Sequence, residues 1–143
     1  MITDKQAQFS DAQAITVTAA STNSIDLGAT GTVINAAGPI VRRISAGGNP
    51  IPLLVQVVED FNNLTSLKID IELDSTSTFT PDKTITIGTF LLAELKKGFQ
   101  VPWHYLPDGI SLQYMQLKYT VTGTAPTTGK ITAGIVAAVQ TAQ

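Results

Sequence analysis

The chain has 143 residues, no cysteine and a formal net charge of -2, and its length is typical of one domain with a single core. The missing cysteines exclude disulfides, thiolate metal sites and thiol nucleophiles, and the near-neutral charge gives no basic surface for nucleic acid. Charged residues make up only 14% of the sequence, against about 25% in an ordinary soluble domain. Because few charges would lose hydration on contact, this composition favours assembly with other proteins.

The N-terminal residues give no targeting signal. They lack the cationic start and the apolar run of a secretion signal, so we expect synthesis in the cytoplasm. No apolar run approaches the roughly 20 residues that a membrane-spanning helix needs, and no membrane partner is expected.

Residues 1–12 are polar and rich in glutamine, with isolated apolar side chains such as Ile2 and Phe9. A segment this short cannot bury itself, so we expect an N-terminal arm followed by one folded domain over residues 13–143. The domain begins with apolar residues that alternate with threonine over residues 14–18, which is typical of a half-buried strand.

A short extended piece over residues 23–28 leads into a long connection. Residues 28–50 contain five glycines and two prolines and predict an irregular loop with one short strand around residues 41–44. Loops of this length in compact domains are usually functional or ordered by a partner.

The next two strands have the clearest patterns. Residues 53–59 are apolar on both faces, as expected for a central strand. In residues 66–74 apolar residues alternate with a ladder that includes Asp70, Glu72 and Asp74. That ladder lacks the Asp-rich loop with a central glycine of a calcium site, so we expect a solvated face and no metal.

Further alternating or apolar segments predict strands over residues 83–90, 99–103, 114–121 and 130–139. The small residues Ala133 and Gly134 indicate the close approach of another backbone, within the fold or across a subunit interface. One segment resembles a helix, residues 91–97, closed by Gly98. Seven to nine strands separated by turns predict an all-β fold, a jelly-roll-like β-sandwich of two antiparallel sheets.

No group of residues carries a recognisable mechanism. His104 has no nucleophile or carboxylate marked beside it, and its neighbours Trp103 and Tyr105 belong in a core or interface more often than in a sugar-stacking platform. Arg42 and Arg43 lie in the long loop without interleaved aromatic residues, which favours a salt bridge to a partner or plain solubility over nucleic-acid binding. We therefore expect no enzymatic activity and no cofactor.

Several segments resemble tailed-bacteriophage capsid cement (decoration) proteins, of the type found on a Bordetella podophage. They are MITD (1–4), FSDAQA (9–14), STNSIDLG (21–28), LLVQV (53–57) with the strand that runs on to residue 75, MQLKYTV (115–121) and GKITAG (129–134). The resemblance spans nearly the whole chain, and the sequence departs from it in residues 29–50.

The resemblance implies a jelly roll that self-associates as a dimer and binds the outside of a shell of the phage major capsid protein. There it would bridge capsomers as part of the virion, after synthesis in the host cytoplasm, without touching nucleic acid. We expect the partner contacts at Ile2, Phe9, Asp11, Arg42, Arg43, Trp103, His104 and Tyr105. A carbohydrate-binding jelly-roll adhesin and a minor head-tail connector protein remain alternatives.

Overall fold

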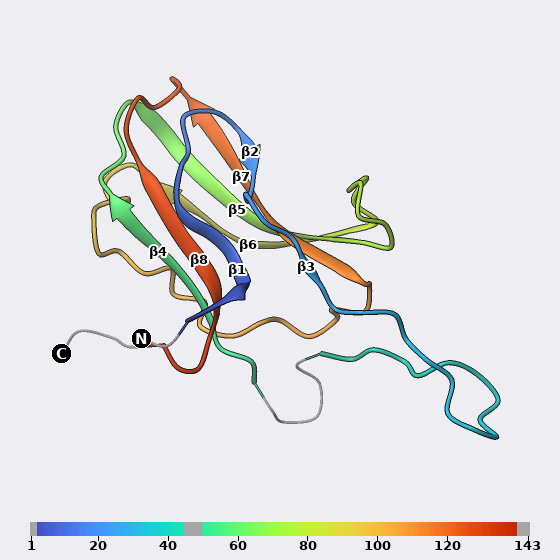
Figure 1. Ribbon diagram of the computed structural model, residues 1–143. Helices are drawn as coiled ribbons and strands as arrows, with labels where there is room; N and C mark the ends of the chain where they lie inside the picture. Colours follow the sequence, from blue (N-terminus) through green and yellow to red (C-terminus); the bar gives the residue numbers. More distant parts are fainter. Residues whose placement is uncertain (1–2, 45–49, 140–143) are drawn as a thin grey trace.

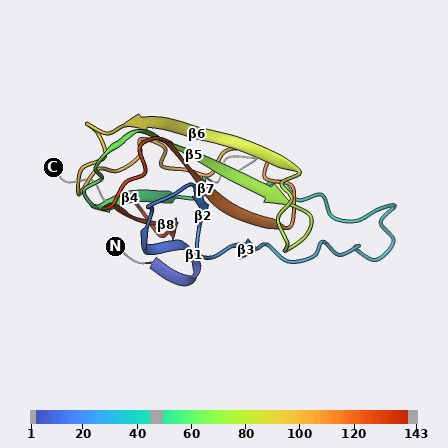
Figure 2. The same cartoon turned by 90° about the horizontal axis from the view of Figure 1, so that it is seen from above.

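The protein is an all-β sandwich of two antiparallel sheets, seen in a computed structural model that describes residues 3–44 and 50–139 (Figure 1, Figure 2). The strands are β1 (Thr3–Ala14), β2 (Ala19–Ala20), β3 (Ile25–Asp26), β4 (Leu53–Glu59), β5 (Leu64–Asp74), β6 (Lys83–Leu91), β7 (Tyr114–Gly123) and β8 (Lys130–Val136). One sheet has the order β1-β8-β4. The other has the order β2-β7-β5-β6, and β3 also pairs with β7.

A further segment, residues 99–105, extends the three-stranded sheet beyond β4. The main-chain nitrogens of Leu53 and Val57 donate to the carbonyls of His104 and Phe99, each at 2.9 Å. With this segment in fourth place, the sheet order β1-β8-β4-(99–105) faces β2/β3-β7-β5-β6, which is the jelly-roll arrangement. The predicted fold class is confirmed.

The core lies between the two sheets. The apolar face predicted for β5 is confirmed, because Leu67, Ile69, Ile71 and Leu73 are at most 1% exposed. Side chains of the other sheet that meet them include Phe9, Leu53, Val55, Val57, Ile131 and Ala133.

The predicted N-terminal arm is wrong for the described residues 3–12, which belong to strand β1. This strand pairs with β8, from Thr3 opposite Val136 to Ala14 opposite Lys130, with three register shifts on the way. Those irregularities break the alternation of apolar and polar residues that would have revealed a strand. The side chain of Phe9 is fully buried, so β1 is part of the folded domain.

The predicted close approach at Gly134 is confirmed, and the approaching backbone belongs to the same chain. A Cβ atom at Gly134 would lie 3.0 Å from both the carbonyl oxygen of Ala7 and the Cα of Gln8. Because Gly134 has no side chain, the bulged part of β1 can pass close to β8 at this position.

Three other local predictions are wrong. Residues 91–97 form turns in place of a helix, because β6 runs to Leu91 and the chain then folds back to bury Leu95 in the core. Residues 15–18 connect β1 to β2, and Val17 is 59% exposed. Residues 41–44 form no strand, since only Ile44 makes an isolated bridge, to Ile110.

The polar face of β5 is also less solvated than its sequence predicted. Asp70 and Asp74 are only 4% and 2% exposed, because neighbouring side chains and loops pack around this central strand. Each finds a local partner: Lys68 Nζ lies 3.0 Å from an Asp70 oxygen, and the main-chain nitrogen of Thr76 donates to Asp74 at 2.6 Å.

Candidate partner-binding surfaces

Residues 28–41, which we call the apolar loop, project from the sandwich between β3 and β4 (Figure 1, Figure 2). The loop folds back on itself through a bridge between Thr32 and Pro39 and a hydrogen bond from the nitrogen of Ile40 to the carbonyl of Gly31 at 2.8 Å. At its tip Asn35 has a φ of 66°, in the left-handed region that asparagine tolerates. The result is a short hairpin that joins neither sheet.

The apolar loop exposes four large aliphatic side chains and no ionisable group. The exposed fractions are 58% for Val33, 89% for Ile34, 55% for Ile40 and 76% for Val41. They are four of the seven large hydrophobic side chains that are exposed in the described part of the chain. Clustered exposed apolar residues mark interaction sites more often than scattered ones do.

In the sequence, Arg42 and Arg43 pointed to the long connection of residues 28–50 as a contact region, and the exposed aliphatic residues of the apolar loop were not predicted. The signal that could have found them is the run of residues 28–41 without a single charge, in a stretch that glycine and proline keep out of the core. Because the loop pairs with neither sheet, its aliphatic side chains are exposed to solvent and available to another protein.

Arg42 holds the base of the apolar loop to the sandwich. Its guanidinium donates to the carbonyl oxygens of Leu27 and Gly28, which lie where the chain leaves β3. The side chain is half-buried, whereas that of Arg43 is exposed. Of the two predicted contact residues, Arg42 is thus hydrogen-bonded within the chain, whereas Arg43 is exposed to solvent.

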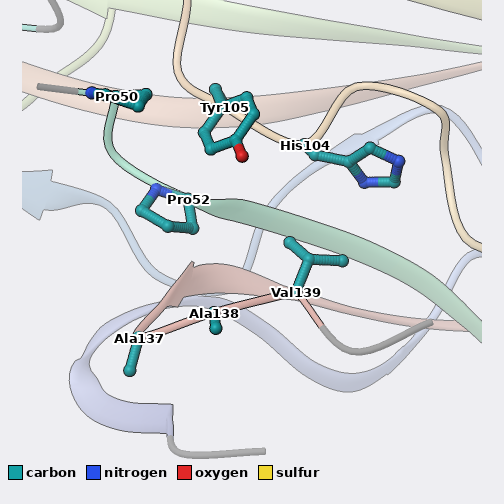
Figure 3. A pocket seen from close by; sticks show the side chains of 7 residues that line it. All are labelled: Pro50, Pro52, His104, Tyr105, Ala137, Ala138 and Val139. Atoms are coloured by element: carbon teal, nitrogen blue, oxygen red, sulfur yellow. The ribbon is translucent and has the colours of Figure 1, made fainter. Parts of the chain in front are cut away.

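A second surface is a pocket of about 420 Å³ at the end of β4 (Figure 3). It is lined by Pro50, Pro52, His104, Tyr105, Ala137, Ala138 and Val139. Of the three neighbouring residues predicted as contacts, His104 and Tyr105 line it, and Tyr105 is 51% exposed. Trp103 instead packs, partly buried, against the core.

The two described N-terminal contact residues, Phe9 and Asp11, have different surroundings. Phe9 is fully buried, so it is not available to a partner and its predicted role is corrected. Asp11 is exposed and pairs with Lys5 at 2.6 Å. The hydrogen bond and the positive charge of Lys5 lower the pKa of Asp11. Ile2 lies outside the described residues.

The described residues contain no group of three or more His, Asp or Glu side chains placed to hold a metal ion. Within the same residues no helix is long and apolar enough to cross a membrane.

Fold and surface together define a jelly-roll domain with an uncharged apolar projection. The chain belongs to the Bbp16 family, whose model matches residues 9–139. The family name suggests a Bordetella phage protein. No curated protein matches the sequence.

Proposed function

We propose that this protein is a capsid cement protein, a structural protein that binds the outside of a shell of phage major capsid protein and bridges its capsomers. Membership of the Bbp16 family supports a phage origin. The observation that carries the proposal is the apolar loop, since it offers a projecting contact element that the sandwich itself does not use.

The apolar loop has the physical properties of a docking element. A two-stranded hairpin that packs on nothing is marginally stable in water, so burial against another protein would order it further. Fully burying a side chain such as Ile34 or Val41 contributes roughly 1.5–3 kcal/mol. Part of that gain is offset by the entropy lost on ordering the loop.

Such binding would stabilise a shell by mass action. A protein that binds the assembled shell but not its separate subunits shifts the equilibrium toward the assembled state. Copies with more than one contact gain avidity from the second contact without a stronger individual site. This mechanism needs no catalytic group.

The pocket does not favour the carbohydrate-binding alternative over this one. A sugar-stacking platform would need several aromatic faces open to solvent. Of the two candidate rings only Tyr105 is exposed, because Trp103 packs against the core. A glycan array on the isolated protein tests that alternative directly, and we expect no bound glycan.

Co-sedimentation with undecorated capsids tests the proposal. We expect the protein to sediment with assembled shells and not with dissociated subunits. Ile34→Asp and Val41→Asp should each weaken binding by about tenfold or more, because each places a charge in an apolar contact. Val17→Asp is the matched control, since Val17 is also exposed, at 59%, but lies in the turn between β1 and β2.

A second pair of variants tests how the loop is held. Arg42→Ala frees the base of the apolar loop and should weaken shell binding, whereas Arg43→Ala removes a charge from the next residue and should bind nearly as the wild type. Failure of the wild type to bind shells, or equal binding by Ile34→Asp, Val41→Asp and Val17→Asp, would contradict the proposal.

A further inference from the structure

The side chains of the apolar loop point to two opposite faces of its hairpin. Thr32 and Pro39 form the bridge that pairs the two arms. The chain neither turns nor bends at Val33, Ile40 and Val41, so adjacent residues there point to opposite faces. Val33 and Ile40 are each one residue from the bridged pair, and they therefore lie together on the face opposite to that pair.

The other face of the hairpin carries Val41. This residue directly follows Ile40, so it points the other way, to the same face as Pro39. Ile34 lies in the turn at the tip, between the two faces. The hairpin therefore has large aliphatic side chains on both faces and at its tip.

Neither face of the hairpin is covered by the sandwich. Every residue from 28 to 41 is exposed, and Figure 1 shows the loop extending away from both sheets. The glycines of the loop leave open space beside them, because a Cβ atom added at Gly31 or at Gly38 would have no heavy atom within 4 Å. The apolar loop is thus a projection whose two faces are both open to a partner.

We propose that the apolar loop enters a cleft of the shell that has two apolar walls, so that each face of the hairpin contacts one wall. This inference rests on the proposed function and adds the shape and the chemistry of the partner's site. A single flat surface could bury Ile40 or Val41 but not both, because the two side chains point in opposite directions. A cleft with two walls buries both, and the gain in free energy rises with the apolar area removed from water.

The walls of this cleft carry no charge where they meet the loop. Residues 28–41 contain no ionisable group, so a charged side chain on either wall would lose its hydration without gaining an opposite charge. Attachment to shells should therefore stay unchanged as NaCl is raised from about 0.05 M to about 1 M, since salt screens contacts between charges and not apolar ones. Release of the bound protein over this range would overturn the uncharged cleft.

Charge variants at two neighbouring residues compare the two faces. Ile40→Asp and Val41→Asp place the same charge on opposite faces, and each should weaken co-sedimentation with undecorated shells by about tenfold or more. Val17→Asp, outside the loop, should bind like the wild type. A wild type that does not bind shells would overturn the proposed function as a whole. A wild type that binds, with an Ile40→Asp variant that binds equally well, would overturn this inference alone.

Cross-linking maps the two walls directly. The chain has no cysteine, so Ile40→Cys and Val41→Cys each provide a single thiol for a short photoactivated cross-linker. After attachment to shells and illumination, mass spectrometry of the cross-linked peptides should find different segments of the shell protein for the two positions. The same segment for both positions would show a single wall and would overturn the inference, even if both charge variants bind weakly.

Discussion

The phenol oxygen of Tyr119 lies 2.8 Å from the hydroxyl oxygen of Ser10, and neither side chain is exposed. Ser10 belongs to β1 and Tyr119 to β7, so this contact links the two sheets. The Ser10 hydroxyl donates to Gln13 Oε1 at 2.7 Å, which leaves its oxygen to accept from Tyr119. Burial raises the pKa of the Tyr119 phenol, so the donor keeps its proton.

We expect Tyr119→Phe to lower the free energy of unfolding by about 1–2 kcal/mol, because it removes a buried hydrogen bond while leaving the ring in place. Urea denaturation at neutral pH measures the change. Ser10→Ala should have a similar effect, and the double variant should cost less than the sum of the two, since both remove the same contact. Strict additivity would show that the two hydroxyl groups act independently.

Phe9→Ala should lower the free energy of unfolding by about 3–5 kcal/mol, as expected for the loss of a fully buried phenylalanine. Thermal and urea melts of the isolated protein check this. Asp11→Ala, two residues further along the same strand, removes an exposed ion pair and should leave stability nearly unchanged. An unaltered melting temperature in Phe9→Ala would mean that β1 is dispensable for the fold.

Gly134→Ala should destabilise the domain by about 1–3 kcal/mol, because the added methyl group meets the backbone of β1. Gly31→Ala is the matched control, since a Cβ there has nothing within 4 Å. Parallel urea titrations compare the two variants. Equal stability of both would show that β1 can move away from β8 at no cost.

Asp74 should make the stability of the domain depend on pH. The main-chain N–H of Thr76, which donates to the carboxylate at 2.6 Å, is the main cause that lowers the pKa of Asp74 below its ordinary value of 3.8. The charged carboxylate therefore stabilises the fold above that value, and the contribution is lost as the pH falls through the lower folded pKa.

The measurement compares wild type and Asp74→Asn by urea denaturation at several pH values. The wild type should be the more stable at neutral pH, and the difference should shrink below about pH 4, where the unfolded aspartate binds its proton. Asp4→Asn, at an exposed position on β1, is the control. A difference that stays constant down to pH 2 would contradict this account.

The strands with regular alternation were predictable from the sequence. β5 and β7 are central strands with one face on the core, so burial imposes a period of two on their residues. β4 was predictable with its observed bounds because it is apolar on both faces. β1 was not predictable, because its register shifts leave Phe9 outside a regular alternation of apolar and polar residues.

The candidate surfaces were predictable only as regions. Glycine and proline marked the long loop, but which of its side chains face solvent depends on the hairpin that it forms and on the contacts of Arg42. The exposure of Tyr105 and the partial burial of Trp103 follow from the path of residues 99–105 along β4. A pattern of neighbouring aromatic residues carries no information about that path.

The pairing of β1 with β8 also constrains when the chain can fold. The main-chain partners of residues 3–14 are in residues 130–136, so the two paired strands are far apart in the sequence. During synthesis β1 emerges well before β8, and contacts of such long sequence separation form slowly. Until then Phe9 has no complete core to enter, and the unfinished domain exposes an unpaired strand at the stage when aggregation is most favoured.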